Sequence, residues 1–179
     1  MTCRLRLVVA LFLGILAGVA SAGSIVGSNY VSETDGVIEV AADGWNIMDT
    51  EKTPIFPNHI ARFFIQRQLK GGTLRPFADF FRLANPGGQV QPQAFLQEIA
   101  QNMSKVPGMT VSPISSRQFG GRTVLALPAT MKVKDGTSHG VIYVMHGEKS
   151  IYWAQLFAHQ LLWDEARTVF DQLMENVKY

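Results

Sequence analysis

The sequence contains a single cysteine, Cys3, and none after it. Disulfides need two cysteines, and thiolate catalysis and cysteine-ligated metal or iron–sulfur sites need at least one in the folded part. The rest of the chain therefore has to be held together by its core alone. The 157 residues from Gly23 onward can bury roughly 68–70% of their unfolded surface, which is enough for one domain without cross-links.

Charged residues are scarce at the start of the chain, where only Arg4 and Arg6 precede residue 23. An uninterrupted apolar stretch, Leu7–Ala20, follows them, and small residues come next, in the order Ala-Ser-Ala. This order is typical of a secretory signal peptide. The stretch is shorter than the roughly 20 residues of a membrane-spanning helix, which disfavours an uncleaved anchor. We expect residues 1–22 to be removed, leaving 23–179 as a single periplasmic or secreted domain.

An excess of positive charge is also missing once these residues are removed. Without Arg4 and Arg6, the 16 Lys and Arg of the chain fall to 14, against 14 Asp and Glu. A neutral domain lacks the basic surface of a nucleic-acid-binding protein. Cys3 does not lie at the cleavage point, so no lipid attachment is indicated, and we expect membrane contact to be at most peripheral. The sequence gives no indication of the oligomeric state.

Ser-x-x-Lys and His-Glu-x-x-His, which mark common catalytic sites, are absent, and the Gly-Gly pairs lack the Walker lysine and the Gly-x-Gly-x-x-Gly spacing. Gly136–Gly140 has the spacing Gly-x-Ser-x-Gly, but it lies at the start of an expected strand and not at the strand-to-helix turn of a nucleophile elbow. We therefore expect neither catalysis nor a cofactor. Catalytic residues can also come together from distant parts of a chain, so a small hydrolase without a recognisable motif is the alternative.

The first half of the domain is the harder part to interpret. Val37–Ala41 and Trp45–Met48 flank Asp43-Gly44, a pair that favours tight turns, and this predicts a hairpin. In residues 58–70, apolar side chains near one helical stripe predict a helix. The β-prone run Phe63–Ile65 makes a strand the alternative for this segment.

The second half has clearer periodicity. Pro76–Leu83 reads as a strand, a helix is predicted to begin at Pro92 and end before Pro107, and an amphipathic helix covers about 162–177. Four strands are expected between the helices: 109–119, 122–134, 138–146 and 150–158. Their short, glycine-containing turns require antiparallel neighbours. We predict an α/β (α+β) fold, in which an antiparallel sheet is flanked by the central and C-terminal helices as a three-layer sandwich.

The order of these elements resembles a known family. The resemblance rests on Ile38–Val40 with Gly44-Trp45, the helix Gln93–Lys105, Gly120-Gly121 before an alternating strand, and Tyr143 and Tyr152 around Gly147. The chain resembles the PsbP-like and DcrB-like family of extracytoplasmic α/β proteins. The resemblance implies a three-layer fold and an accessory role in docking to other proteins, without catalysis. It transfers no functional residue, because no site motif of the family matches particular positions here.

Histidines are the candidates for a metal site. His139 and His159 are weak candidates for metal ligands, because the distance between them depends on the turn that joins their strands. A two-residue turn at Glu148-Lys149 pairs Ser138 with His159 and places the two histidines on opposite faces. A three-residue turn makes them diagonal neighbours, close enough to share a ligand. Zinc sites use three or four ligands, and no third one is apparent, so we expect no metal.

The segment between His59 and Arg82 is rich in basic residues and contains a single acid, Asp79. Its basic residues are Arg62, Arg67, Lys70, Arg75 and Arg82. They form either a solvated surface or a patch for an acidic partner or anionic lipid, since arginine binds carboxylates and phosphates in bidentate fashion. The leading hypothesis is a non-catalytic exported accessory protein that binds an envelope or periplasmic protein, possibly an acidic one, through this segment. The alternatives are a hydrolase and a carrier of a small ligand or metal.

Overall fold

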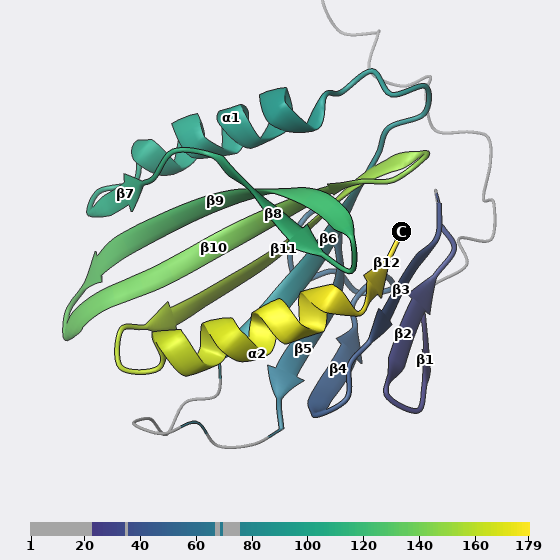
Figure 1. Cartoon of the computed structure of the whole chain (residues 1–179), viewed down its shortest axis with the longest axis horizontal. Helices are drawn as coiled ribbons and strands as arrows, with labels where there is room; N and C mark the ends of the chain where they lie inside the picture. Colours follow the sequence, from purple (N-terminus) through teal and green to yellow (C-terminus); the bar gives the residue numbers. More distant parts are fainter. Residues whose placement is uncertain (1–22, 35, 67–68, 70–75) are drawn as a thin grey trace, which may run out of the picture.

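The computed structural model describes residues 23–34, 36–66, 69 and 76–179, and about half of these residues belong to the strands of two antiparallel sheets (Figure 1). The larger sheet has the strand order β4-β5-β6-β11-β10-β9-β7, and β8 also pairs with β9. Its strands are β4 (Trp45–Asp49), β5 (His59–Ile65), β6 (Phe77–Ala84), β7 (Met109–Val111), β8 (Ser115–Phe119), β9 (Arg122–Val133), β10 (Gly136–His146) and β11 (Ser150–His159). In the interior strands β10 and β11, side chains on both faces are buried.

The smaller sheet brings together the two ends of the described chain. It has the order β1-β2-β3-β12. Its strands are β1 (Ser24–Val26), β2 (Asn29–Ser32), β3 (Ile38–Ala41) and β12 (Val177–Lys178). Because β12 pairs with β3, the last residues of the chain close this sheet.

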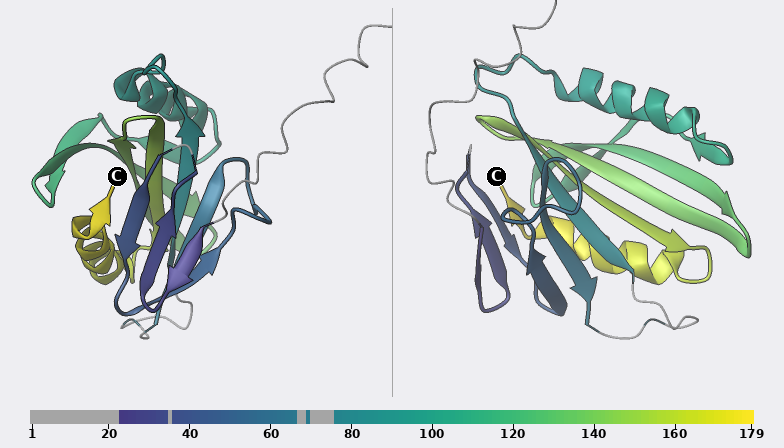
Figure 2. Two further views of the ribbon diagram at one scale, coloured as in Figure 1. Left: turned by 90° about the vertical axis from the view of Figure 1, so that its right-hand side faces the viewer. Right: turned by 180° about the vertical axis from the view of Figure 1, so that it is seen from behind.

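The two helices pack against opposite faces of the larger sheet (Figures 1 and 2). Helix α1 (Pro92–Ser104) buries Leu96 in a core cluster with side chains from β9, β10 and β11. Helix α2 (Trp163–Glu175) buries Phe170 in a second cluster, which the smaller sheet shares through Tyr30 and Val40. Within the described part of the chain, neither helix is long and apolar enough to cross a membrane.

The structure confirms the predicted mixture of a mostly antiparallel sheet with two helices. The four strands between the helices are present, but 109–119 is divided into β7 and β8 at Ser112–Ile114, and both pieces pair with β9. Proline at position 113 has no N–H to donate, which is consistent with the interruption there. Strands β1, β2 and β12 were not expected from the sequence.

The predicted helix over 58–70 is wrong, because β5 occupies His59–Ile65. Ala61, Phe63 and Ile65 are buried in the core shared with α2, while Arg62 and Phe64 point to the other face. This is the period of two that a strand requires. The apolar residues that suggested a helical stripe are therefore divided between two faces.

The predicted hairpin around Asp43-Gly44 is also wrong, since β3 belongs to the smaller sheet and β4 to the larger one. The turn is present: Trp45 N donates to Ala42 O at 3.0 Å, and Gly44 has φ +82°. A two-residue hairpin needs a positive φ at the first central residue, whereas here only the second has one. The turn therefore carries the chain from one sheet to the other.

Candidate functional site

Helix α1 covers only part of its face of the larger sheet. Viewed from behind, β4, β5 and β6 have no helix over the face turned to the viewer (Figure 2, right). A row of paired residues crosses this face, from Met48 through Arg62 and Asp79 to Gln155 and Ile142. Ile142 lies in the core cluster under α1, while Met48 is 37% exposed. The row therefore leads from a covered core to an open surface.

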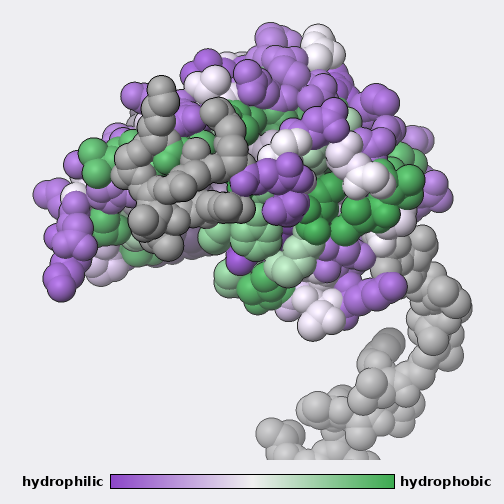
Figure 3. Space-filling model, turned by 90° about the horizontal axis from the view of Figure 1, so that it is seen from below, coloured by the Kyte–Doolittle hydropathy of each residue, from purple (hydrophilic) through white to green (hydrophobic). Residues whose placement is uncertain are grey.

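A hollow of about 230 Å³ lies in this open part of the face. Its lining residues are Phe56, Arg62, Phe77, Asp79, Gln155 and Phe157, and we name it the aromatic hollow. Phe56 and Phe77 are 47% and 39% exposed, which is unusual for side chains of this size. The rest of the described surface also exposes hydrophobic residues, and the view from below shows them in patches among hydrophilic ones (Figure 3).

Two contacts hold the aromatic side chains of Phe77 and Phe157, which form walls of the hollow. The Arg62 guanidinium lies over the Phe77 ring, with Cζ 3.9 Å from its centroid, a cation–π geometry. The Phe157 ring occupies the space that a Cβ atom would need at Gly140, its partner on β10. A side chain at position 140 would displace this ring.

The floor of the hollow is a buried charged network centred on Asp79. Its Oδ1 lies 3.0 Å from His59 Nε2, and Arg62 donates from Nε to Oδ1 at 2.6 Å and from Nη2 to Oδ2 at 3.0 Å. Burial alone would raise the pKa of Asp79. The hydrogen bonds from His59 and Arg62, together with the Arg62 charge, outweigh burial and lower this pKa below its usual value. Asp79 is therefore a carboxylate that neutralises Arg62.

Gln155 supplies an uncommitted polar group beside the network. Its side chain is partly buried, and the described residues give its amide no hydrogen-bond partner. An amide offers two donors and one acceptor oxygen, which matches the hydrogen-bonding groups of a peptide backbone. Among the residues that the structure describes, the aromatic hollow thus combines apolar walls with an amide that is free to bond a partner.

A second cavity, of about 270 Å³, lies beside Glu51 and is lined by Glu51, Pro54, Asn58, His59, Ile60, Arg82 and Ala84. Arg82 Nη1 pairs with Glu51 Oε1 at 3.0 Å. Both cavities are smaller than the roughly 300–1,000 Å³ of typical small-molecule sites. They are better suited to one side chain of a partner than to a larger ligand.

The structure separates the basic residues that the sequence grouped together. Arg62 shares a face with Asp79, whereas Arg82 shares the opposite face with Tyr152. Their side chains are only 15% and 11% exposed, and both are paired with acids. Asp79, the partner of Arg62, and Arg82 are three residues apart on β6, and such residues point to opposite faces of a strand. The two arginines therefore do not form one exposed patch. Arg67, Lys70 and Arg75 lie outside the described residues, and their role in binding stays a prediction.

The two candidate metal ligands point away from each other. Ser138 pairs with His159 and His139 pairs with Ala158, as the two-residue turn requires, so the histidines occupy opposite faces of the sheet. The His139 ring stacks on Trp163 at 5.6 Å between centroids, and His159 Nε2 lies 3.1 Å from Asp135 O. In the part of the chain that the structure describes, no three His, Cys, Asp or Glu residues are grouped to hold a metal.

Most residues of the aromatic hollow were not identified from the sequence. Arg62 was named among the basic residues, but Phe56, Gln155 and Phe157 were not considered. The available signal was the strand alternative for 58–70. A strand at His59–Ile65 followed by one at Phe77 forms an antiparallel pair, and that pairing brings Arg62 opposite Asp79.

Comparison with solved structures finds proteins of similar fold. The cyanobacterial PsbP protein CyanoP from Synechocystis matches with a TM-score of 0.58 and 16% identity, over 93% of this chain and 98% of that one. LpqN from Mycobacterium tuberculosis, involved in cell envelope biogenesis, matches with a TM-score of 0.50 and 19% identity, over 79% and 82%. No family model and no curated protein matches the sequence. These likenesses show a PsbP-like fold.

Proposed function

We propose that this protein is an exported, non-catalytic accessory protein of the PsbP-like family, which binds another protein in the cell envelope or periplasm. The PsbP-like fold, with the three-layer arrangement that the family implies, supports this assignment, as does the signal-peptide pattern of residues 1–22. LpqN, a protein of similar fold, is described as involved in cell envelope biogenesis. The proposed location is the periplasm or the exterior of the cell.

The observation that carries the proposal is the aromatic hollow on the part of the sheet that α1 leaves open. Exposed aromatic side chains around a small cavity are the usual anchoring points of protein interfaces. The occupant that we propose is an apolar, preferably aromatic, side chain of the partner, with its backbone amide bonded to Gln155. Because Asp79 neutralises Arg62, the hollow itself favours an apolar group over an acidic one.

The buried network also supports a binding role over catalysis. His59 is fully buried beneath the hollow, and its Nε2 is engaged by Asp79. A general base has to lie within hydrogen-bond reach of the proton that it removes. His59 Nδ1 is also buried, with no hydrogen-bond partner in the described part of the chain, so neither ring nitrogen is within reach of a substrate proton. We therefore assign the Asp79–His59 pair to holding Arg62 and the Phe77 wall in place.

Serine substitutions test the proposal. Phe56→Ser and Phe77→Ser, which alter exposed residues of the hollow, should each weaken partner binding about tenfold or more, as truncation of an anchoring residue does. The matched controls are Val106→Ser and Leu161→Ser, which alter exposed apolar residues elsewhere. Affinity is measured by titrating each purified variant against the partner isolated from envelope extract. Equal affinities for all four variants, or turnover in a hydrolase panel without any partner, would overturn the proposal.

A further inference from the structure

Gly23 lies in a narrow space between Glu51 and Tyr30, where a side chain would not fit. Its backbone N donates to Glu51 Oε2 at 2.7 Å. A Cβ atom at this position would lie 2.5 Å from Tyr30 Cε2, closer than real Cβ contacts permit. The narrow space therefore holds one backbone nitrogen against a carboxylate and leaves room only for glycine.

The Glu51 carboxylate joins the two sheets. Its Oε1 accepts from Ser32 Oγ at 2.5 Å and from Arg82 Nη1 at 3.0 Å, and it lies 3.1 Å from the Tyr30 hydroxyl. Tyr30 and Ser32 belong to β2 of the smaller sheet, and Arg82 belongs to β6 of the larger one. The Glu51 side chain is only 7% exposed, so these bonds lie in a poorly hydrated junction.

The charges at this junction do not balance in the uncleaved chain. Arg82 contributes one positive charge, whereas Glu51 and Asp49 contribute two negative ones, and Asp49 Oδ1 accepts from Glu51 N at 3.0 Å. Tyr30 stays neutral, because burial and the charges of Glu51 and Asp49 raise its pKa well above the usual value. One more positive charge beside Glu51 would balance the group.

We propose that cleavage of the Ala22–Gly23 bond supplies that charge, by creating an α-ammonium group that ion-pairs with Glu51 and completes the junction between the two sheets. In the hydrolysis, the water oxygen bonds to the Ala22 carbonyl carbon and the C–N bond breaks. Ala22 leaves as a carboxylate, and the Gly23 amine takes up a proton, since the pKa of a free α-amino group is about 7.7–8.0. The inference rests on the export part of the proposed function and not on partner binding.

A comparison of two chain starts tests this site. One protein, released by protease from a fusion, begins at Gly23, and the other carries one additional alanine ahead of Gly23. The unfolding equilibrium constant should be about tenfold smaller for the Gly23 start, the effect of a charge-assisted hydrogen bond. The difference should disappear when both carry Glu51→Gln. Equal stability of the two starts with Glu51 intact would overturn the inference.

A second readout applies even if Glu51→Gln prevents folding. The α-amino group of the Gly23 start should react with an amine reagent near neutral pH several times more slowly than that of the extended chain, because it is buried in an ion pair. Equal reaction rates would contradict the inference. Mass spectrometry of the exported product separates the two proposals: a first residue other than Gly23 contradicts the predicted cleavage, whereas a Gly23 start without added stability contradicts only the ion pair.

Discussion

Asp79 is the residue on which the geometry of the aromatic hollow depends. It is the shared acceptor for His59 and for both bonds from Arg62, and Arg62 in turn lies over Phe77. An uncompensated charge in a buried position is costly, because water no longer solvates it. The acid therefore holds in place a cation that would otherwise be unfavourable beneath the hollow.

Asp79→Asn should lower the free energy of unfolding by about 3–5 kcal/mol, since it leaves the Arg62 charge without its buried counter-ion. The control is Glu39→Gln, which breaks the exposed pair between Glu39 and Lys178 and should cost less than about 1 kcal/mol. Denaturant titration of both variants measures the difference. Similar losses in the two variants would show that the Asp79 network contributes no more than a surface ion pair.

The same comparison has a pH dependence. Because the folded-state pKa of Asp79 is lowered, its contribution is fully present above the unfolded value of about 3.9 and is lost as the pH falls through the folded pKa. The gap in unfolding free energy between wild type and Asp79→Asn should therefore narrow below about pH 4. A gap that stays constant throughout acid unfolding would contradict this assignment.

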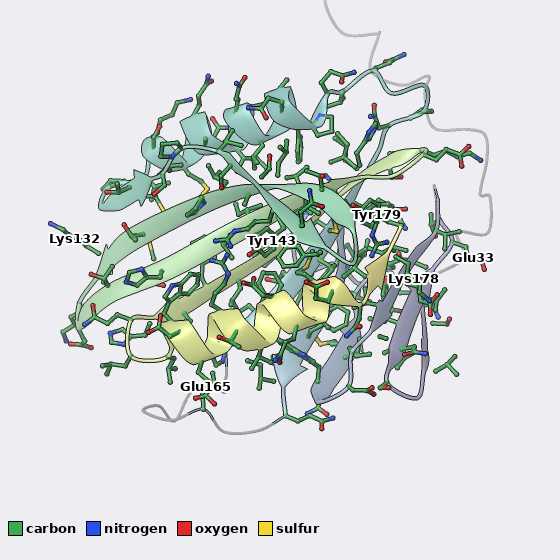
Figure 4. The ribbon with its side chains drawn as sticks, in the orientation of Figure 1. Glu33, Lys132, Tyr143, Glu165, Lys178 and Tyr179 are labelled. Atoms are coloured by element: carbon green, nitrogen blue, oxygen red, sulfur yellow. The ribbon has the colours of Figure 1, made fainter. Side chains whose placement is uncertain are left out.

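Among the elements, α2 is attached to the sheet by a polar contact as well as by its apolar face. The hydroxyl of Tyr143, which lies on β10 and is labelled in Figure 4, donates to Asp171 Oδ1 at 2.6 Å. Arg167 Nε donates to the same oxygen at 2.8 Å. Burial and the neighbouring Asp171 raise the pKa of Tyr143, so the hydroxyl remains a donor at physiological pH. This contact lies on the face opposite the aromatic hollow.

Tyr143→Phe should destabilise the fold by about 1 kcal/mol, the usual net value of one hydrogen bond, because Asp171 keeps its bond to Arg167. Thr168→Ala, at an exposed position of α2, should change stability by less than about 0.5 kcal/mol. Thermal or denaturant unfolding checks both values. Partner affinity should be unchanged in Tyr143→Phe, and a loss of affinity without a loss of stability would place the interface on the α2 face instead.

The sequence predicted well those helices and strands that are marked by local patterns of residues. The glycine-containing turns before β9, β10 and β11, and the helical spacing in α1 and α2, act over a few residues. Segment 58–70 was ambiguous, because its apolar residues fit a helical stripe as well as an alternating strand. The deciding factor was tertiary: in β5, Arg62 meets Asp79 and Phe63 enters the core.

For the whole molecule, the division into two sheets could not be predicted from local patterns. The smaller sheet depends on pairing between β3 and β12, which joins Val40 to Val177. The aromatic hollow likewise combines Phe56 with Phe157, about a hundred residues later in the chain. The expectation from composition, a core that needs no cross-links, stays a prediction. The position of the candidate interface depends on which part of the sheet the helices leave uncovered, and local sequence patterns do not determine this.

The central claim is that the aromatic hollow is the surface through which this protein binds its partner. Site-specific photo-crosslinking tests it most directly, with a benzophenone amino acid at position 56 or, as the control, at the exposed position 161 of the protein in the cells that produce it. We predict one discrete, stoichiometric adduct from position 56 and none from position 161, and the adduct should be lost when Phe77→Ser is added. No adduct from position 56, or the same adduct from both positions, would contradict the account.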